Sequence, residues 1–121
     1  MKLIFSAVAL VFGAALPRHV AGHFTLQCSV LVLTGANLQA ECDNDAGELE
    51  FTSINLNNCV AFLDDQLECG NGGGYTSSCT DCSISQQGML SCSCTDEDGD
   101  ISGQSLGLNN CIFVNDGNLA C

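Results

Sequence analysis

Apolar and polar residues alternate in short runs along most of the chain, which is the pattern of half-buried β-strands. The stretch CSVLVLTGANLQAEC, residues 28–42, contains an apolar run, a turn with glycine, and alternation from Leu38 to Cys42. The stretch TSINLNN alternates again from Ile54. No segment after residue 22 places apolar residues at helical spacing, so the pattern predicts an all-β fold.

Two further stretches predict β-hairpins. CVAFLDDQLEC is centred on Asp64 and Asp65, and CIFVNDGNLAC is centred on Asp116 and Gly117. Asp-Gly between apolar runs is the strongest short-range signal for a hairpin. Each hairpin begins and ends with a cysteine, so the two segments have the same design.

The chain also repeats itself with a period of about 52 residues. SINLNNC at 53–59 returns as SLGLNNC at 105–111, whereas Phe24 matches Tyr75 at an offset of 51. This slip of one residue predicts a longer turn or a bulge in one copy. Two copies are too few for a solenoid, so we predict one pseudo-symmetric domain. Its parts are repeat one (23–69), a glycine-rich linker (70–74) and repeat two (75–121).

The first 22 residues predict a secretory signal peptide. Lys2 precedes the apolar run LIFSAVALVFGAAL, and small residues follow up to Gly22. The run is too short for a stable membrane span. Cleavage after Gly22 leaves a secreted, extracellular domain of residues 23–121, and cleavage nearer Ala15 or Ala21 is an alternative.

Removal of this segment makes the chain strongly acidic. The full sequence has 14 acidic and 2 basic residues and a formal charge of −12. Both basic residues, Lys2 and Arg18, lie in the signal, so the mature chain carries a charge of about −14. Nucleic acid and anionic membranes are excluded as partners, because binding to phosphate groups needs Lys or Arg. A neutral or basic partner is compatible with this charge.

All ten cysteines lie in the mature chain, and a secretory route predicts that they form disulfides. Residues that face each other in a hairpin have a constant sum of residue numbers, which suggests a pairing. The alternative to disulfides is a zinc site with four thiolate ligands. It is disfavoured because an oxidising compartment consumes free thiols first. The predicted pairs are Cys28–Cys42, Cys59–Cys69, Cys79–Cys94, Cys82–Cys92 and Cys111–Cys121.

These stretches together resemble the cyanovirin-N homology family. The resemblance rests on FTLQCSVLVLTGANLQAEC, on SINLNNCV, on the turn at Asp64 and on the second copy, and it covers residues 24–121. It implies a pseudo-two-fold fold in which each half has a three-stranded sheet plus a β-hairpin, with the hairpins exchanged between the halves. It also implies a lectin for glycans of the mannose type, as a monomer or a domain-swapped dimer.

The resemblance further implies two glycan pockets, one in each half. Sugar recognition needs fixed carboxylates, amides and backbone groups that face pairs of hydroxyls. The first pocket maps to His23, Leu26, Gln27, Asp43, Asn44, Asp45, Val114 and Asp116. The second maps to Ala61, Asp64, Gly74, Ser77, Ser78, Thr95, Asp96 and Glu97. The alternative is a disulfide-stapled secreted scaffold or interaction protein that has lost sugar binding.

Metal and enzyme functions have weaker support. The stretch DEDGD at 96–100 has oxygens at alternating positions, as in a calcium loop, but it lacks the distal Glu and the flanking helices. The mature chain has one histidine, His23, at its new N-terminus, where chain ends are loose. No pair of carboxylates stands out as a glycosidase pair. We therefore predict no enzyme activity, no cofactor and no metal.

Overall fold

The computed structural model describes residues 23–121, which form ten strands and four single-turn 3-10 helices; the predicted signal peptide, 1–22, lies outside the described residues. The strands are β1 (Cys28–Thr34), β2 (Asn37–Asp43), β3 (Leu49–Asn55), β4 (Val60–Leu63), β5 (Gln66–Cys69), β6 (Cys79–Ile84), β7 (Met89–Thr95), β8 (Ile101–Gly107), β9 (Phe113–Asn115) and β10 (Asn118–Ala120). The 3-10 helices are η1 (Phe24–Leu26), η2 (Leu56–Asn58), η3 (Tyr75–Ser77) and η4 (Leu108–Asn110). Within residues 23–121, no helix has the length and apolar character that a membrane crossing requires.

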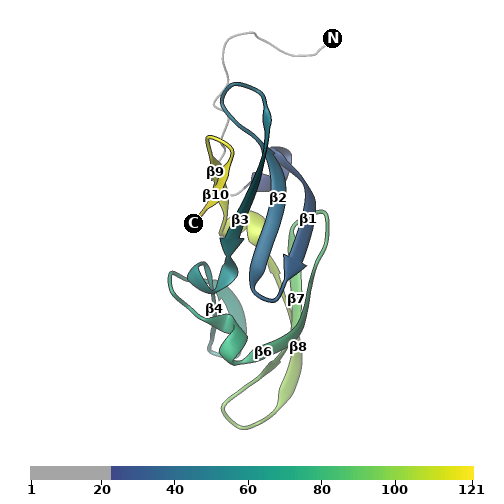
Figure 1. Cartoon of the computed structure of the whole chain (residues 1–121). Helices are drawn as coiled ribbons and strands as arrows, with labels where there is room; N and C mark the ends of the chain where they lie inside the picture. The colour runs from purple at the N-terminus through teal and green to yellow at the C-terminus, as the bar shows by residue number, and fades with distance from the viewer. Residues whose placement is uncertain (1–22) are drawn as a thin grey trace.

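The predicted all-β fold is confirmed. Strands β1, β2 and β3 form one antiparallel sheet and β6, β7 and β8 form another, with the hairpins β4–β5 and β9–β10 beside them (Figure 1). Each hairpin packs against the sheet of the other repeat, β10 on β3 and β5 on β8. The Leu119 N–H donates to the Thr52 hydroxyl at 3.0 Å, and the Leu67 N–H donates to the Gln104 side-chain oxygen at 3.4 Å. The hairpins are therefore exchanged between the halves.

One hydrophobic core joins the two repeats, and equivalent residues of each repeat fill it. Alternation along β2 and β7 buries one face of each strand, as the period of two requires. The equivalent buried pairs are Phe24 and Tyr75, Leu38 and Leu90, Cys42 and Cys94, Leu56 and Leu108, Val60 and Ile112, and Leu67 and Leu119.

The difference of one residue in the offset between the two copies arises in a turn. Leu33 pairs with Leu38 across the β1–β2 turn, whereas Ile84 pairs with Leu90 across the β6–β7 turn, which is one residue longer. Both β1 and β6 also contain a bulge, so the bulge is shared and does not cause the slip. The predicted longer turn is thus confirmed.

The repeated phrase Asn-Asn-Cys connects each copy to the other one. The Asn109 side chain accepts from the Thr25 N–H at 3.1 Å and donates to the Thr25 hydroxyl at 2.8 Å. The Asn57 side chain accepts from the Thr76 N–H at 3.1 Å and from the Thr76 hydroxyl at 3.0 Å. Each first asparagine therefore fixes the first turn of the opposite copy.

Three of the predicted disulfides are confirmed and two are wrong. Cys28–Cys42, Cys79–Cys94 and Cys82–Cys92 form as expected. The remaining cysteines pair between the hairpins instead of within them. The observed bridges are Cys59–Cys121, with a Cα–Cα distance of 5.7 Å, and Cys69–Cys111, with 5.2 Å.

The register of the hairpins explains this error. Val60 faces Cys69 in the β4–β5 ladder, so Cys59 lies one position away from the residue that faces Cys69. Successive residues of a strand point to opposite faces, and an offset of one residue therefore turns the two thiols apart. The β9–β10 ladder has the same offset, since Asn118 faces Asn115. Each hairpin thus presents its cysteines to the other hairpin.

The glycine-rich segment 70–74 folds back along residues 57–61. The N–H groups of Gly70 and Gly74 donate to the carbonyls of Cys59 and Asn57 at 2.8 and 3.0 Å. A Cβ atom on Gly73 would lie 2.6 Å from the Val60 carbonyl oxygen. The absence of a side chain therefore permits this close approach of two backbone segments.

We expect Tyr75→Phe to raise the free energy of unfolding by about 1 kcal/mol, because Tyr75 is 1% exposed and its buried hydroxyl has no hydrogen-bond partner within residues 23–121. Burial also raises the pKa of Tyr75. The unfolded chain therefore ionises first as the pH rises above about 10, and stability falls there in the wild type only. Urea unfolding at neutral and alkaline pH measures both effects. A less stable Phe variant would show that the hydroxyl has a partner.

Candidate functional site

The first predicted pocket is built where the loop after β2 meets the tip of the β9–β10 hairpin. The Asp45 N–H donates to the Asp116 carboxylate at 2.9 Å, although the two residues are 71 positions apart. The Asp43 N–H donates to the Gln27 carbonyl oxygen at 2.9 Å. The fold thus brings together three segments that the sequence separates, and all of them carry predicted pocket residues.

Asn44 gives this loop its shape. Its side-chain oxygen accepts from the N–H groups of Ala46 and Glu48, both at 2.9 Å, and its amide donates to Glu50 at 2.8 Å. Gly117 is buried against the same loop, and a Cβ atom there would lie 2.9 Å from the Glu50 carboxylate. The sequence reading missed Glu50 and Gly117. The Asp-Gly turn signal points to Gly117, whereas no sequence pattern identifies Glu50.

The other predicted residues of the first pocket differ in exposure. The side-chain oxygen of Gln27 is buried and has no hydrogen-bond partner within the described part of the chain. His23 precedes η1 and Leu26 ends it, and both are exposed at the start of that part. Val114 is buried in the core and offers no side-chain surface to a ligand. The side-chain oxygen of Gln27 is therefore shielded from solvent beside the loop.

The second predicted pocket repeats this construction. The Thr95 N–H donates to the Ser78 carbonyl oxygen at 2.9 Å, as Asp43 does to Gln27 in the first pocket. The Asp96 carboxylate accepts from the N–H groups of Asp98 and Asp100, both at 2.9 Å. Asp96 is the counterpart of Asn44, so both loops are closed by the same hydrogen bonds.

The rim of the second pocket includes Ser77, Gly74 and Ala61. The Ser77 hydroxyl donates to the Gly74 carbonyl oxygen at 3.0 Å, and Gly74 forms a β-bridge with Ala61. Ala61 is buried and, like Val114, contributes no accessible side chain. Ser77 is exposed, so its hydroxyl is accessible at this rim.

Carboxylates crowd the second pocket. Asp64 and Asp65 form the tip of the β4–β5 hairpin with positive φ angles of 50° and 63°. Partial desolvation, and then the charges of the four carboxylates nearby, raise the pKa of Asp65; these belong to Asp96, Asp98, Glu97 and Asp64. Residues 23–121 contain no Lys or Arg to neutralise this charge. Asp65 therefore lies close to the loop that includes Glu97. The sequence did not predict it as a residue of the second pocket.

Oxygens of Asp96, Asp98 and Asp100 lie within 4.8 Å of one another. The first loop adopts the same hydrogen-bonded shape with the neutral side chain of Asn44 at the central position. A cation is thus not needed to form this loop. Asp98 and Asp100 are exposed, and carboxylates in a surface turn are common without a bound metal.

Comparisons with known proteins place this geometry in context. The chain matches the CVNH domain family over residues 24–120. A search of curated proteins finds no match. Solved structures with the same fold include the Mo0v variant of MoCVNH3 in complex with (N-GlcNAc)4, which is 16% identical with a TM-score of 0.76; the match covers 83% of this chain and 97% of that chain.

Two further structures have higher sequence identity. TbCVNH from T. borchii is 26% identical, with a TM-score of 0.69, and the match covers 80% of this chain and 96% of that one. Microvirin, solved in complex with mannobiose, is also 26% identical, with a TM-score of 0.62, and the match covers 71% and 85% of the two chains. Both similarities extend over most of residues 23–121.

Proposed function

Because this chain belongs to the CVNH family, we propose that it is a secreted lectin that binds glycans without catalysis. The observation that carries the proposal is the hydrogen bond from the Asp45 N–H to Asp116, which holds loop 43–48 against the tip of the opposite hairpin. This contact fixes the polar groups of two separate segments in one orientation. Recognition of sugar hydroxyls requires such fixed groups.

We propose that polar side chains of the two pockets contact the sugar. In the first pocket the carboxylates can each accept hydrogen bonds from two hydroxyls. We assign the first pocket to His23, Gln27, Asp43, Asn44, Asp45 and Asp116. We assign the second pocket to Asp64, Ser77, Ser78, Thr95, Asp96 and Glu97.

Neutral sugars are the proposed ligands. Two relatives were solved with mannobiose and with (N-GlcNAc)4, and both sugars are uncharged. The acidic loops of this chain repel anionic glycans, because residues 23–121 hold 14 acidic and no basic residues. We therefore propose oligosaccharides of mannose or N-acetylglucosamine.

Secretion is part of the proposal. Five disulfides join all ten cysteines, and such a density in a small domain is typical of extracellular proteins.

A glycan array with oxidised residues 23–121, with and without a chelator, tests the function. We expect selective binding that the chelator does not change. A blank array from correctly bridged protein would contradict the proposal and favour the scaffold without sugar binding.

We expect Asp116→Ala to weaken glycan binding at the first pocket by about tenfold. The reason is that the variant loses one hydrogen bond between a sugar hydroxyl and a charged carboxylate. Asp64→Ala is the matched control at the second pocket. The two aspartates have φ angles of 49° and 50°, so alanine carries the same backbone cost at both positions. NMR titration with mannobiose reports each pocket separately through the backbone signals of 43–48 and 95–100. Equal losses at both pockets in either variant would contradict the assignment.

A further inference from the structure

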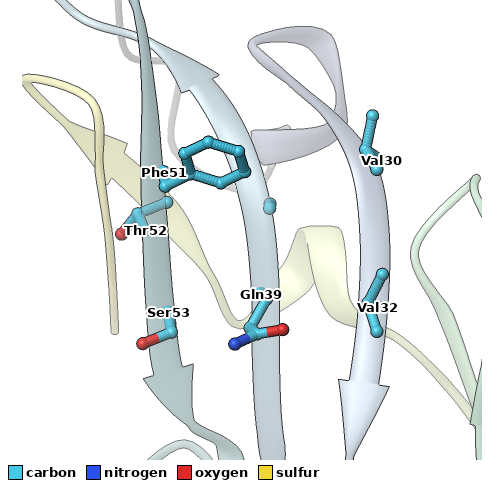
Figure 2. Close-up of a pocket in the computed structure, with 7 residues that line it drawn as sticks. Val30, Val32, Gln39, Phe51, Thr52 and Ser53 are labelled. Carbon is cyan, nitrogen blue, oxygen red and sulfur yellow. The ribbon is translucent and has the colours of Figure 1, made fainter.

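The outer face of the β1–β2–β3 sheet carries exposed apolar side chains. Phe51 is 85% exposed, and Leu49 precedes it on the same face of β3 at 61%. Val30 and Val32 on β1 are 55% and 45% exposed. Figure 2 shows the ring of Phe51 reaching from β3 toward β2, with the two valines on the far side of Gln39. Phe51 and the two valines, together with Gln39 and Ser53, line a groove of about 370 Å³, which lies within the size range of ligand pockets.

The second repeat shows that the fold does not need this apolar face. At the equivalent positions of β6 and β8, Asp81 replaces Val30, Ser83 replaces Val32 and Gly103 replaces Phe51. Both sheets have the same register and the same bulge. A solvent-facing sheet normally presents polar residues. The second sheet has no apolar side chain at these three positions, although Ile101, the equivalent of Leu49, is 72% exposed. The apolar residues of the first sheet therefore need an explanation other than folding.

Val30 supports this point. It lies in the β1 bulge with a φ angle of 56°, a conformation that is uncommon for a β-branched residue. Asp81 has the same conformation in β6, and aspartate adopts it more readily. A valine at this position costs stability and exposes apolar surface, yet it completes one wall of the groove.

We propose that this face, centred on Phe51, is an extension subsite that takes a further sugar unit of a neutral oligosaccharide seated in the first pocket. The inference rests on the proposed function and deepens it. The apolar face of a sugar ring packs against the Phe51 ring, whereas Gln39 and Ser53, which pair across β2 and β3, bind its hydroxyls.

The groove lies close to the end of β2 and β3 at which the first pocket is built. Asp43, a residue of that pocket, pairs with Leu49, and the next pair on the same face is Glu41 with Phe51. Successive pairs on one face of a sheet are separated by about 7 Å. A further sugar unit can therefore reach Phe51 from the Asp43 side of the first pocket, whereas Glu50, which closes the loop, points to the opposite face of the sheet.

Charge selects among the possible occupants. Glu41 lies beside Phe51 on this face, and the whole of residues 23–121 is acidic. A second copy of the chain brings the same negative charge to the contact, which opposes association. A neutral sugar meets no such repulsion, and it is the ligand class already proposed for the adjoining pocket.

The test compares short and long sugars on the wild type and on Phe51→Ala. The probes are mannobiose and mannotetraose, and the dimer and tetramer of N-acetylglucosamine, measured by calorimetry with NMR signals of 43–48 as a monitor of the first pocket. We expect the wild type to bind one tetramer about tenfold tighter than its dimer and Phe51→Ala to lose that gain only. Phe51→Tyr keeps the ring and retains the gain. Met89→Ala, on the outer face of the other sheet, binds as the wild type does.

Equal tetramer affinity for the wild type and Phe51→Ala overturns the inference while the proposed function stands. The same holds if Phe51→Ala weakens dimer and tetramer alike. If sedimentation shows a dimer of the wild type that Phe51→Ala abolishes, with no change in tetramer affinity, a second copy covers the face and the inference fails. A wild type that binds no probe overturns the proposed function itself, and this is visible before any variant is made.

Discussion

Cys59→Ala together with Cys121→Ala is expected to lower the free energy of unfolding by about 3 kcal/mol. The bridge spans 62 residues, but the nested Cys69–Cys111 bridge shortens its loop. The loop that remains has roughly 20 residues, for which the chain-entropy model gives about 3 kcal/mol. Urea unfolding at neutral pH measures the loss, and alanine avoids burial of a hydroxyl at the buried Cys59.

The matched control is Cys59→Ala with Cys69→Ala, which removes one cysteine from each observed bridge. We expect two free thiols in this control and none in the first variant, since the Cys69–Cys111 bridge stays intact there. The reverse result would restore the pairing within each hairpin. Peptide mapping gives an independent check with a protease that cleaves before aspartate, because residues 23–121 have no site for trypsin. Cys59 and Cys121 should then lie in one linked pair of fragments.

Gly73→Ala is the second change with a large expected effect, a loss of about 3 kcal/mol in the free energy of unfolding. The new Cβ atom would lie 2.5 Å from the Ala61 Cα atom and 2.6 Å from the Val60 carbonyl oxygen. Both are backbone atoms, so no side-chain rotation relieves the clash. Residues 70–74 and 57–61 must move apart, and their hydrogen bonds are lost with them.

Gly103→Ala in β8 is the control for this change. A Cβ atom on Gly103 meets no atom within 4 Å, so we expect its stability to stay within 1 kcal/mol of the wild type. Urea unfolding compares the two variants directly. Gly73→Ala combined with Ala61→Gly should recover only part of the loss, because the clash with the Val60 oxygen remains. A fully stable Gly73→Ala would show that the segment packs loosely.

The sequence predicts most of the fold because two independent signals agree. Alternation with a period of two identifies the strands, and the repeat shows that each copy has the same ones. The resemblance then supplies the exchange of hairpins, which no local pattern contains. The tie between Asn109 and Thr25 illustrates the limit, because it joins residues 84 positions apart.

The errors and omissions have the same physical origin. The predicted pair of Cys59 with Cys69 took account of distance along the hairpin but not of the face to which each side chain points. An offset of one residue reverses the direction of a side chain. Glu50 joins the first pocket because β3 brings it beside Asn44 and the tip of the β9–β10 hairpin. No pattern in the sequence around Glu50 indicates this. The groove around Phe51 was missed because an exposed phenylalanine on a strand resembles a core residue until its face is known.

The arrangement of the disulfides has a consequence for the connectivity of the molecule. Four bridges lie entirely within residues 59–121 and the fifth within 23–58, so none crosses the boundary after Asn58. A single cut of the backbone at that boundary therefore yields two fragments that denaturant alone separates, without a reductant. For the same reason, an exchange of residues 23–58 between two molecules would break no disulfide.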